Sequence, residues 1–187
     1  PCWSATRSSC RRSPTSNAAT SSFSGIRVAG CGTRKARNAV RFEGTGEFAT
    51  TTVRGHAVDN RITVLDANGV HPRLLNKHIN YDTCCAPIPN PENALSVSQP
   101  LDMAISADGQ TLYTAVLGND KVVLYDTHQL EQDTFFPSTH TQIPVSGGGP
   151  TGLALDQPRN RLYVLTRFDN GLSIINTHLK QEIAHLT

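Results

Sequence analysis

Acidic residues are missing from the first 42 positions of this 187-residue chain. That stretch holds seven arginines and one lysine, a formal charge of +8, whereas the other 145 residues carry nine bases and all fifteen acids, a charge of −6. A basic arm can mark a nucleic-acid-binding tail, but such tails cluster Lys and Arg. Here the arginines are scattered among Ser, Thr, Ala, Gly and Cys. We therefore expect no nucleic-acid partner.

The same stretch lacks hydrophobic periodicity and any continuous apolar run. Periodicity is the main signal of a strand or helix, and a long apolar run marks a secretory signal or a membrane span, so none of these is expected. We predict that residues 1–45 are disordered, because they bury too little apolar surface to offset their ordering entropy. Our interpretation is that this segment is non-native, a frame-shifted reading of GC-rich DNA; the alternative is an organellar transit peptide.

Spacings typical of catalytic and metal sites are missing as well. None of the five cysteines forms a C-x-x-C pair, so zinc ribbons, thioredoxin-like centres and c-type haem attachment are unsupported. No serine lies in a G-x-S-x-G nucleophile elbow. We expect no catalytic residue, no metal site and no cofactor in this chain, and we expect it not to be an enzyme.

A repeat with a pitch of fifty residues is present in the body of the chain, residues 46–187. Residues 102–113 align without gaps on 152–163, and residues 121–128 align on 171–178. Residues 59–66 repeat the second half of the unit. His128 and His178 fall on equivalent positions, which favours a structural role, because a catalytic residue would normally be unique to one unit.

The repeat unit predicts short antiparallel strands, at 101–106, 110–117, 121–126 and 141–145. Asp108-Gly109 predicts a hairpin turn in which both central residues have φ > 0. Units of this length and strand content indicate an all-β fold: about two and a fraction four-stranded antiparallel blades of a truncated β-propeller. An immunoglobulin-like sandwich is the alternative, but it would not repeat without gaps. The terminal blades should expose apolar faces, with Leu172, Ile174 and Ile175 at the C-terminal end.

Three stretches of the last unit resemble the YVTN-type β-propeller repeat: PTGLALD at 150–156, LYVLT at 162–166 and GLSIINT at 171–177. That family's unit runs roughly P-x-G-V-A-V-S-P-D-G, then V-Y-V-T-N, then V-S-V-I-D-T. The resemblance covers residues 59–187, and it departs at Thr114–Val116 and in an inserted stretch at 67–99. It implies a bacterial, extracytoplasmic propeller, in some members part of a cell-surface protein or fused to c-type cytochrome modules.

The non-repeat insertion at 67–99 carries the most chemically varied side chains of the body. They are His71, His78, Tyr81, Asp82, Cys84 and Cys85. A zinc or copper site drawn from His78, Cys84 and Cys85 is one interpretation, but adjacent cysteines point to opposite sides of an extended chain. We therefore place no metal here. Cys84 and Cys85 are instead candidates for a disulfide, with packing as small buried hydrophobes the remaining alternative.

The glycine run Gly147–Gly149 before Pro150 has the composition of a phosphate-binding loop, but it enters a strand rather than a helix N-terminus. We interpret it as a connection between blades.

Taken together, the sequence favours a non-catalytic scaffold or interaction module outside the cytoplasm. Its expected partner is another protein or the remaining propeller blades. The alternative is the propeller portion of a larger redox protein, whose haem would be bound by c-type cytochrome modules elsewhere in the full-length parent. A propeller enzyme such as a lactonase or a quinohaem dehydrogenase ranks third, because no metal or cofactor ligands for it can be identified.

Overall fold

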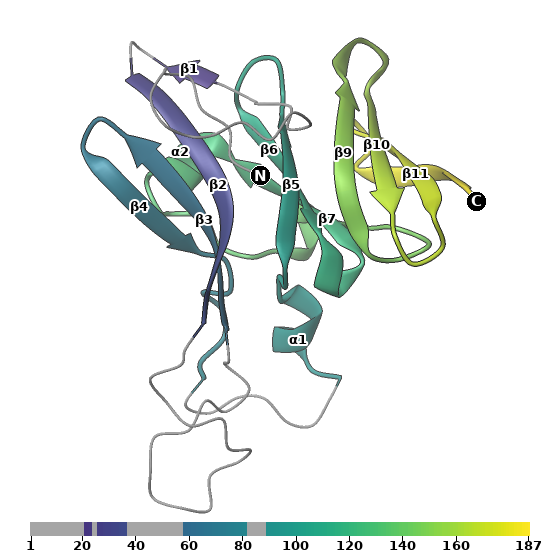
Figure 1. Ribbon diagram of the computed structural model, residues 1–187, viewed down its shortest axis with the longest axis horizontal. Helices are drawn as coiled ribbons and strands as arrows, with labels where there is room; N and C mark the ends of the chain where they lie inside the picture. Colours follow the sequence, from purple (N-terminus) through teal and green to yellow (C-terminus); the bar gives the residue numbers. More distant parts are fainter. Residues whose placement is uncertain (1–20, 24–25, 37–57, 82–88) are drawn as a thin grey trace, which may run out of the picture.

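Three antiparallel sheets of four strands each follow one another along the chain. The computed structural model describes residues 21–23, 26–36, 58–81 and 89–187, and Figure 1 shows the first and last sheets on opposite sides of the second. The first sheet contains β1 (Ser21–Phe23), β2 (Ile26–Ala36), β3 (Val58–Asp66) and β4 (Gly69–Leu74). The second contains β5 (Pro100–Ile105), β6 (Thr111–Val116), β7 (Lys121–Asp126) and β8 (Gln142–Pro144). The third contains β9 (Pro150–Asp156), β10 (Arg161–Thr166), β11 (Gly171–Asn176) and β12 (Gln181–Leu186).

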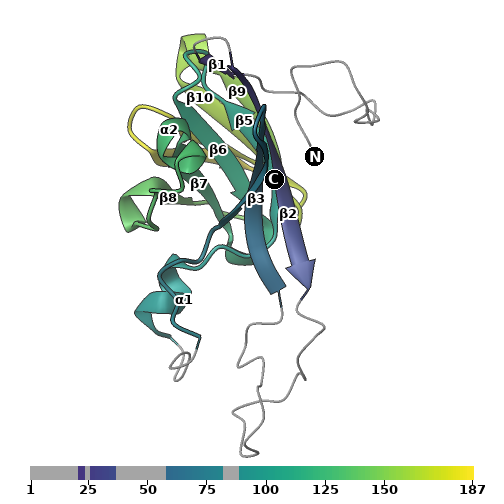
Figure 2. The ribbon, with the colours of Figure 1, turned by 90° about the vertical axis from the view of Figure 1, so that its left-hand side faces the viewer.

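Short helices connect some of these strands. Two are α-helical, α1 (Pro91–Leu95) and α2 (Thr127–Glu131). Three are single 3₁₀ turns, η1 (Leu117–Asn119), η2 (Thr139–Thr141) and η3 (Gln157–Arg159). Figures 1 and 2 both place α1 and α2 toward different ends of the strands.

The first sheet corrects two expectations drawn from the sequence. Part of the segment 1–45, expected to be disordered, forms β1 and β2, and β2 pairs with β3 over residues 29–36. Part of the insertion 67–99 forms β4, which supplies the fourth strand of this sheet. Pairing satisfies backbone N–H and C=O groups whatever the side chains are, so β2 needs no apolar alternation of its own. The rest of 1–45 lies outside the described residues.

The four strands expected in the second sheet are confirmed within one residue at each end, and β9, β10 and β11 begin fifty residues after β5, β6 and β7. The fold class is confirmed too, because three successive four-stranded sheets are blades of a propeller and not the two layers of a sandwich. The turn at Asp108-Gly109 differs from the expected type. Gly109 has φ +74° and Asp108 is not among the residues with positive φ, and the turn closes through a hydrogen bond from Gly109 N to Ser106 O.

The end of the third strand carries the same turn chemistry in every blade. Asp66 Oδ1 accepts hydrogen bonds from the backbone N–H groups of Asn68 and Gly69. Asp126 Oδ1 accepts a hydrogen bond from Gln129 N. Asn176 Oδ1 accepts hydrogen bonds from the N–H groups of His178 and Leu179. Asp and Asn favour such positions because their short side chains replace a backbone acceptor. The Asp or Asn at the end of the third strand therefore marks a turn in each blade.

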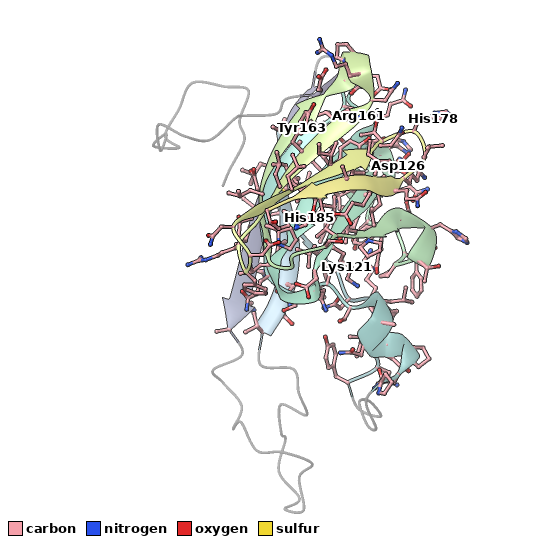
Figure 3. The ribbon with its side chains drawn as sticks, turned by 90° about the vertical axis from the view of Figure 1, so that its right-hand side faces the viewer. Lys121, Asp126, Arg161, Tyr163, His178 and His185 are labelled. Atoms are coloured by element: carbon pink, nitrogen blue, oxygen red, sulfur yellow. The ribbon has the colours of Figure 1, made fainter. Side chains whose placement is uncertain are left out.

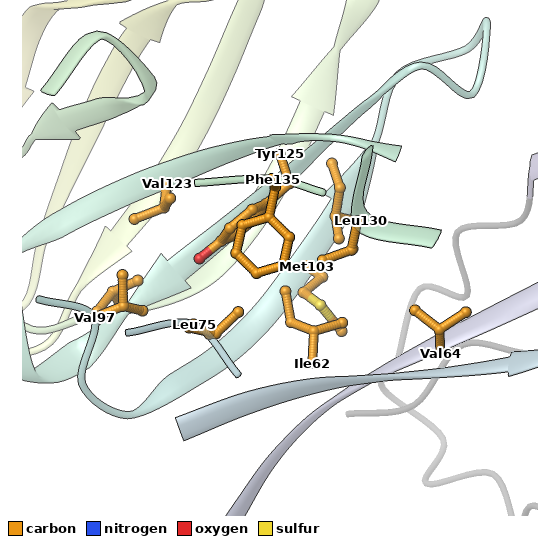
Figure 4. Packing of buried hydrophobic residues seen from close by; sticks show 11 residues of the cluster. Ile62, Val64, Leu75, Val97, Met103, Val123, Tyr125, Leu130 and Phe135 are labelled. Atoms are coloured by element: carbon orange, nitrogen blue, oxygen red, sulfur yellow. The ribbon is translucent and has the colours of Figure 1, made fainter. Parts of the chain in front are cut away.

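Each sheet has a forward face, directed at the next sheet, and a backward face, directed at the previous one. Two buried clusters lie between the three sheets. The first joins the forward face of the first sheet, through Ile62 and Val64, to the backward face of the second, through Val123 and Tyr125; Figure 4 shows its packing around Phe135 and Met103. The second joins the forward face of the second sheet to the backward face of the third.

The period of two along a strand decides which residues enter each cluster. The forward positions Tyr113, Ala115, Val122 and Leu124 of the second sheet are all buried against the third. Fifty residues later the same forward positions are Tyr163, Leu165, Leu172 and Ile174. Leu165 is 51% exposed, and the other three are half-buried.

The expected exposure of the C-terminal blade therefore needs one correction. Leu172 and Ile174 lie on the forward face, as expected, but Ile175 is 0% exposed. Adjacent residues of a strand point to opposite faces, so Ile175 belongs to the backward face and packs in the second cluster.

Successive blades are also joined by a repeated hydrogen bond. Asn60 Oδ1 accepts from Gln99 N at 3.0 Å, and Asp120 Oδ1 accepts from Gly149 N at 2.8 Å. Both donors directly precede the first strand of the next blade, and both have positive φ, +57° and +60°. Asn170 occupies the position of the acceptor in the third blade and, like Asp120, has positive φ, +55° against +50°. We call this bond the inter-blade clasp.

Candidate functional site

The residues singled out in the insertion are only partly placed. Asp82, Cys84 and Cys85 fall within 82–88, outside the described residues. The candidate disulfide between Cys84 and Cys85 therefore stays a prediction.

The two histidines of the insertion bind different partners. His71 Nε2 lies 3.0 Å from Asp66 Oδ1 at the turn between β3 and β4. His78 Nε2 donates to Glu92 O at 2.9 Å, in the first turn of α1. Its Nδ1 is buried and has no hydrogen-bond partner within the described part. Among the described residues no group of three His, Cys, Asp or Glu side chains is arranged to hold a metal ion.

A polar cluster that the sequence did not reveal lies at one end of the third sheet. We call it the His185 cluster: Asp169, Ser173, Glu182 and His185, with Ser146 from the preceding loop. His185 Nε2 lies 2.6 Å from Asp169 Oδ2, and His185 Nδ1 lies 2.9 Å from Ser173 Oγ. Figure 3 shows His185 on the third sheet, with its strands in front of the rest of the molecule. His185 is twelve residues from Ser173 and sixteen from Asp169, and pairing of β11 with β12 brings it beside them.

The order Asp169, His185, Ser173 matches the connectivity of a hydrolase triad. Ser173, however, is 0% exposed and lies on the backward face, against the second sheet. Its hydroxyl is also 3.3 Å from Ser146 O. A nucleophile must reach a substrate carbonyl, and Ser173 Oγ is covered on that side by a neighbouring blade. The geometry therefore favours a structural link between β11, β12 and the loop before β9.

Hydrogen bonds hold both carboxylates of this cluster in the ionised form. The Thr166 hydroxyl donates to Asp169 Oδ1 at 2.8 Å and lowers the pKa of that carboxyl, against a smaller opposing effect of burial and with help from His185. Burial would raise the pKa of Glu182, but hydrogen bonds from Ser173 and from the hydroxyl and N–H of Ser146 bring it below its usual value. Glu182 thus fastens β12 to the loop that enters the blade.

The glycines at 147–149 form that loop between β8 and β9, as expected for a connection between blades. All three have positive φ, between +60° and +77°. The Gly149 N–H donates to the Asp120 carboxylate in the inter-blade clasp, and a Cβ on Gly147 would collide with the Asp169 carboxylate. The loop therefore faces two carboxylates, which is the wrong charge environment for a phosphate.

A buried lysine lies at the start of β7, next to the strand β8 that leads into the glycine loop. Lys121 is 8% exposed, and its Nζ donates to Ala94 O at 2.9 Å and to Gln142 Oε1 at 2.8 Å. Gln142 in turn donates to Leu95 O, so the pair fastens the end of α1 to β7 and β8. Burial lowers the pKa of Lys121 to about 8. Its amine is accordingly held by two uncharged acceptors at the junction of helix and sheet.

Apolar side chains are exposed on the two outer sheet faces of the described residues. On the backward face of the first sheet, Leu65, Val70 and Leu74 are 36%, 66% and 47% exposed. Cross-strand pairing puts Val70 opposite Leu65, and Leu74 opposite Arg61. On the forward face of the third sheet, Leu165 and Leu186 are 51% and 55% exposed. Clustered exposed apolar side chains of this kind mark interaction surfaces.

No helix in the described ranges is both long enough and apolar enough to cross a membrane.

Comparison with known proteins identifies a likeness of fold. No family model matches the chain, and no curated protein matches it. Among solved structures, Kuenenia stuttgartiensis hydrazine synthase is similar, with a TM-score of 0.56 and 17% sequence identity over 81% of this chain. The match spans 42% of the hydrazine synthase chain, so this chain corresponds to less than half of that protein's length. At this identity the likeness shows that the two proteins share a fold.

Proposed function

We propose that this chain is a non-catalytic β-propeller scaffold that works outside the cytoplasm by binding a protein partner through its end blades. The observation that carries the proposal is the contrast between its polar clusters and its apolar faces. The polar atoms of the His185 cluster and of Lys121 form hydrogen bonds that hold loops and strands together. Leu65, Val70 and Leu165 are exposed on faces of the kind that pack together inside the chain.

The extracytoplasmic location rests on the resemblance of residues 59–187 to the YVTN-type repeat. That location would also keep the candidate Cys84–Cys85 pair oxidised. Fractionation of the native host, with an antibody to the chain, should find it in the periplasm or at the cell surface. A purely cytoplasmic pool would contradict this part of the proposal.

A photo-crosslinking amino acid at Leu165 tests the interaction surface. The matched control carries the same group at Arg159, whose side chain is 77% exposed and lies in a turn away from the sheet faces. We expect a discrete cross-linked protein species at position 165 and none at position 159 in living cells. Equal labelling at the two positions, or none at either, would contradict a scaffold that uses the end blades.

A second candidate is the propeller portion of a larger redox protein with c-type haem. The similar fold in hydrazine synthase favours this candidate, because in that enzyme the fold forms part of a longer chain. The full-length gene product, purified from its host, tests it directly: a c-type haem absorption spectrum supports this candidate, and a colourless protein contradicts it.

A further inference from the structure

Among the described residues, nothing covers one forward face and one backward face, which lie at opposite ends of the row of sheets (Figures 2 and 3). The uncovered forward face belongs to the third sheet and includes Leu165, Leu172 and Ile174. The uncovered backward face belongs to the first sheet and includes Leu65 and Val70. Within the chain, forward faces pack on backward faces at both internal junctions. The two exposed faces are therefore of complementary kinds.

Residues at equivalent positions of successive blades show which kind of face each outer face would pack against. Val122 and Leu124 are 0% and 6% exposed, because the third sheet covers them. Leu172 and Ile174 stand at the same positions of the next blade. On the other side, Tyr125 is 6% exposed against the first sheet, whereas Leu65, its equivalent sixty residues earlier, is 36% exposed. Leu172, Ile174 and Leu65 are thus less buried than their counterparts, and those counterparts are buried by contact with an adjacent sheet.

The inter-blade clasp also indicates that the third sheet can pack against a further blade. Asn60 and Asp120 each accept a backbone N–H from the start of the following blade. Asn170 has the equivalent position in the third blade, it shares the left-handed backbone of Asp120, and its side chain is exposed. The third blade therefore carries the acceptor of a third clasp as well as an apolar forward face.

We propose that two copies of this chain associate head to tail, so that the third sheet of each copy packs on the first sheet of the other and a closed ring of six blades forms. This inference rests on the proposed use of the end blades as interaction surfaces. Contacts between unlike faces give either a closed ring or an open filament. Two copies supply six sheets, which lies within the usual range of about four to eight propeller blades.

Charged substitutions at exposed positions test the proposal with little risk to folding. Leu165→Lys blocks the forward face, Val70→Asp blocks the backward face, and both side chains are more than half exposed. The control is Phe136→Lys, because Phe136 is 64% exposed but lies in the loop after α2, on neither face. Sedimentation equilibrium should give twice the 20.2 kDa monomer mass for the wild type and for Phe136→Lys. Each face variant alone should be monomeric, with dimer affinity lowered at least about tenfold.

Mixing the two monomeric variants separates unlike-face pairing from like-face pairing. The Leu165→Lys chain keeps an intact first sheet and the Val70→Asp chain keeps an intact third sheet, so one junction can still form. We expect a mixed dimer that neither variant forms alone. A dimer abolished by only one of the two substitutions, or no recovery on mixing, would overturn head-to-tail pairing.

Three further outcomes of the same experiments decide against the ring. A monomeric wild type overturns it, and so does a mass that keeps growing with concentration, because that indicates a filament. A photo-crosslink from Leu165 to residues 58–74 of a second copy supports it independently of any face variant. If the purified chain is monomeric but Leu165 captures a different protein in cells, the scaffold function stands and the ring is excluded.

Discussion

Two charged side chains at the junctions of the sheets show opposite ways of keeping polar atoms inside a β-rich interior. Lys121 is nearly buried with carbonyl acceptors and no carboxylate, so its charged form is disfavoured. Glu182 accepts hydrogen bonds from a serine N–H and hydroxyl, so its charged form is favoured. Unpaired buried charge costs stability and hydrogen-bonded charge contributes to it, and the two residues should therefore respond to pH in opposite directions.

Lys121→Met should remove a pH dependence at alkaline pH. The folded-state pKa of Lys121 is lowered to about 8 by burial, while the unfolded chain keeps its proton until about pH 10.4. The unfolded state therefore binds more protons between these values, and the free energy of unfolding should rise by about 1–2 kcal/mol from about pH 7.5 to about pH 9.5. Urea unfolding at both pH values measures this. The Met variant should lose most of that rise; an unchanged rise would show that another group causes it.

Glu182→Gln should lower the free energy of unfolding at neutral pH. It should also reduce the amount by which that free energy falls in acid. The folded-state pKa of Glu182 lies below its usual value, so its stabilisation is present above about pH 4.3 and is lost as the pH falls through the folded pKa. We expect the variant to be about 1–2 kcal/mol less stable at pH 7, from the loss of charge-assisted hydrogen bonds. The difference should shrink toward about pH 3 in urea titrations followed by circular dichroism.

Glu131→Gln is the control of opposite sign. Burial raises the pKa of Glu131, so removing its charge should be neutral or slightly stabilising at pH 7. Equal losses of stability in the two glutamine variants would argue against a specific role of Glu182.

Among the connecting elements, the loop between β8 and β9 has the strictest backbone requirement. Gly147 lies against the Asp169 carboxylate and Gly148 lies against the Asp120 carboxylate. All three glycines of the loop have positive φ. That conformation is accessible to glycine at little cost and is strained for residues with a Cβ. The glycine run is thus explained by the entry of the chain into a new blade, without any ligand.

Gly147→Ala should destabilise the chain strongly. The new methyl group would collide with the Asp169 carboxylate at φ +77°, and the cost should be about 2–3 kcal/mol or more, because strain and displacement of a hydrogen-bonded carboxylate combine. Gly152→Ala is the matched control: a Cβ there would meet Leu165 at 3.6 Å, an ordinary contact without positive φ. Urea unfolding of both variants measures the difference, and equal effects would contradict the loop's proposed role.

At the scale of the whole molecule, the described residues form a row of three sheets in which each interior junction is buried and each outer face exposes apolar side chains. In each of its two buried clusters the strand residues come from two adjacent sheets, so stability depends on neighbouring blades as in other repeat proteins. An end blade has one covered face where a middle blade has two. Covering the open faces should therefore stabilise the whole stack.

The thermal midpoint of the wild type should rise with chain concentration, because association linked to the folded state stabilises it by mass action. Differential scanning calorimetry over about a hundredfold concentration range measures this. Leu165→Lys and Val70→Asp should show midpoints that do not depend on concentration, and Phe136→Lys should behave as the wild type does. A midpoint independent of concentration in all four proteins would contradict stabilisation through the end faces.

The sequence by itself determined the repeat, the strands of the second and third blades and the polarity of their faces. Local pattern suffices there, because alternation of apolar positions fixes which side of a strand is buried. It also predicted the exposed face of the C-terminal blade, but the placement of Ile175 on that face was wrong, because Ile174 and Ile175 are adjacent in a strand and point to opposite faces. Ile26 and Val28, which alternate around Arg27, were the one local signal for β2.

Tertiary structure alone decided the features that depend on residues distant in sequence. The strand β2 exists because β3, more than twenty residues later, supplies its hydrogen-bond partners. The His185 cluster arises because pairing of β11 with β12 brings Ser173 beside His185, and its serine is made inaccessible by a neighbouring sheet. Pattern along the chain reports what each residue prefers locally, whereas pairing and packing between blades select which of those residues meet.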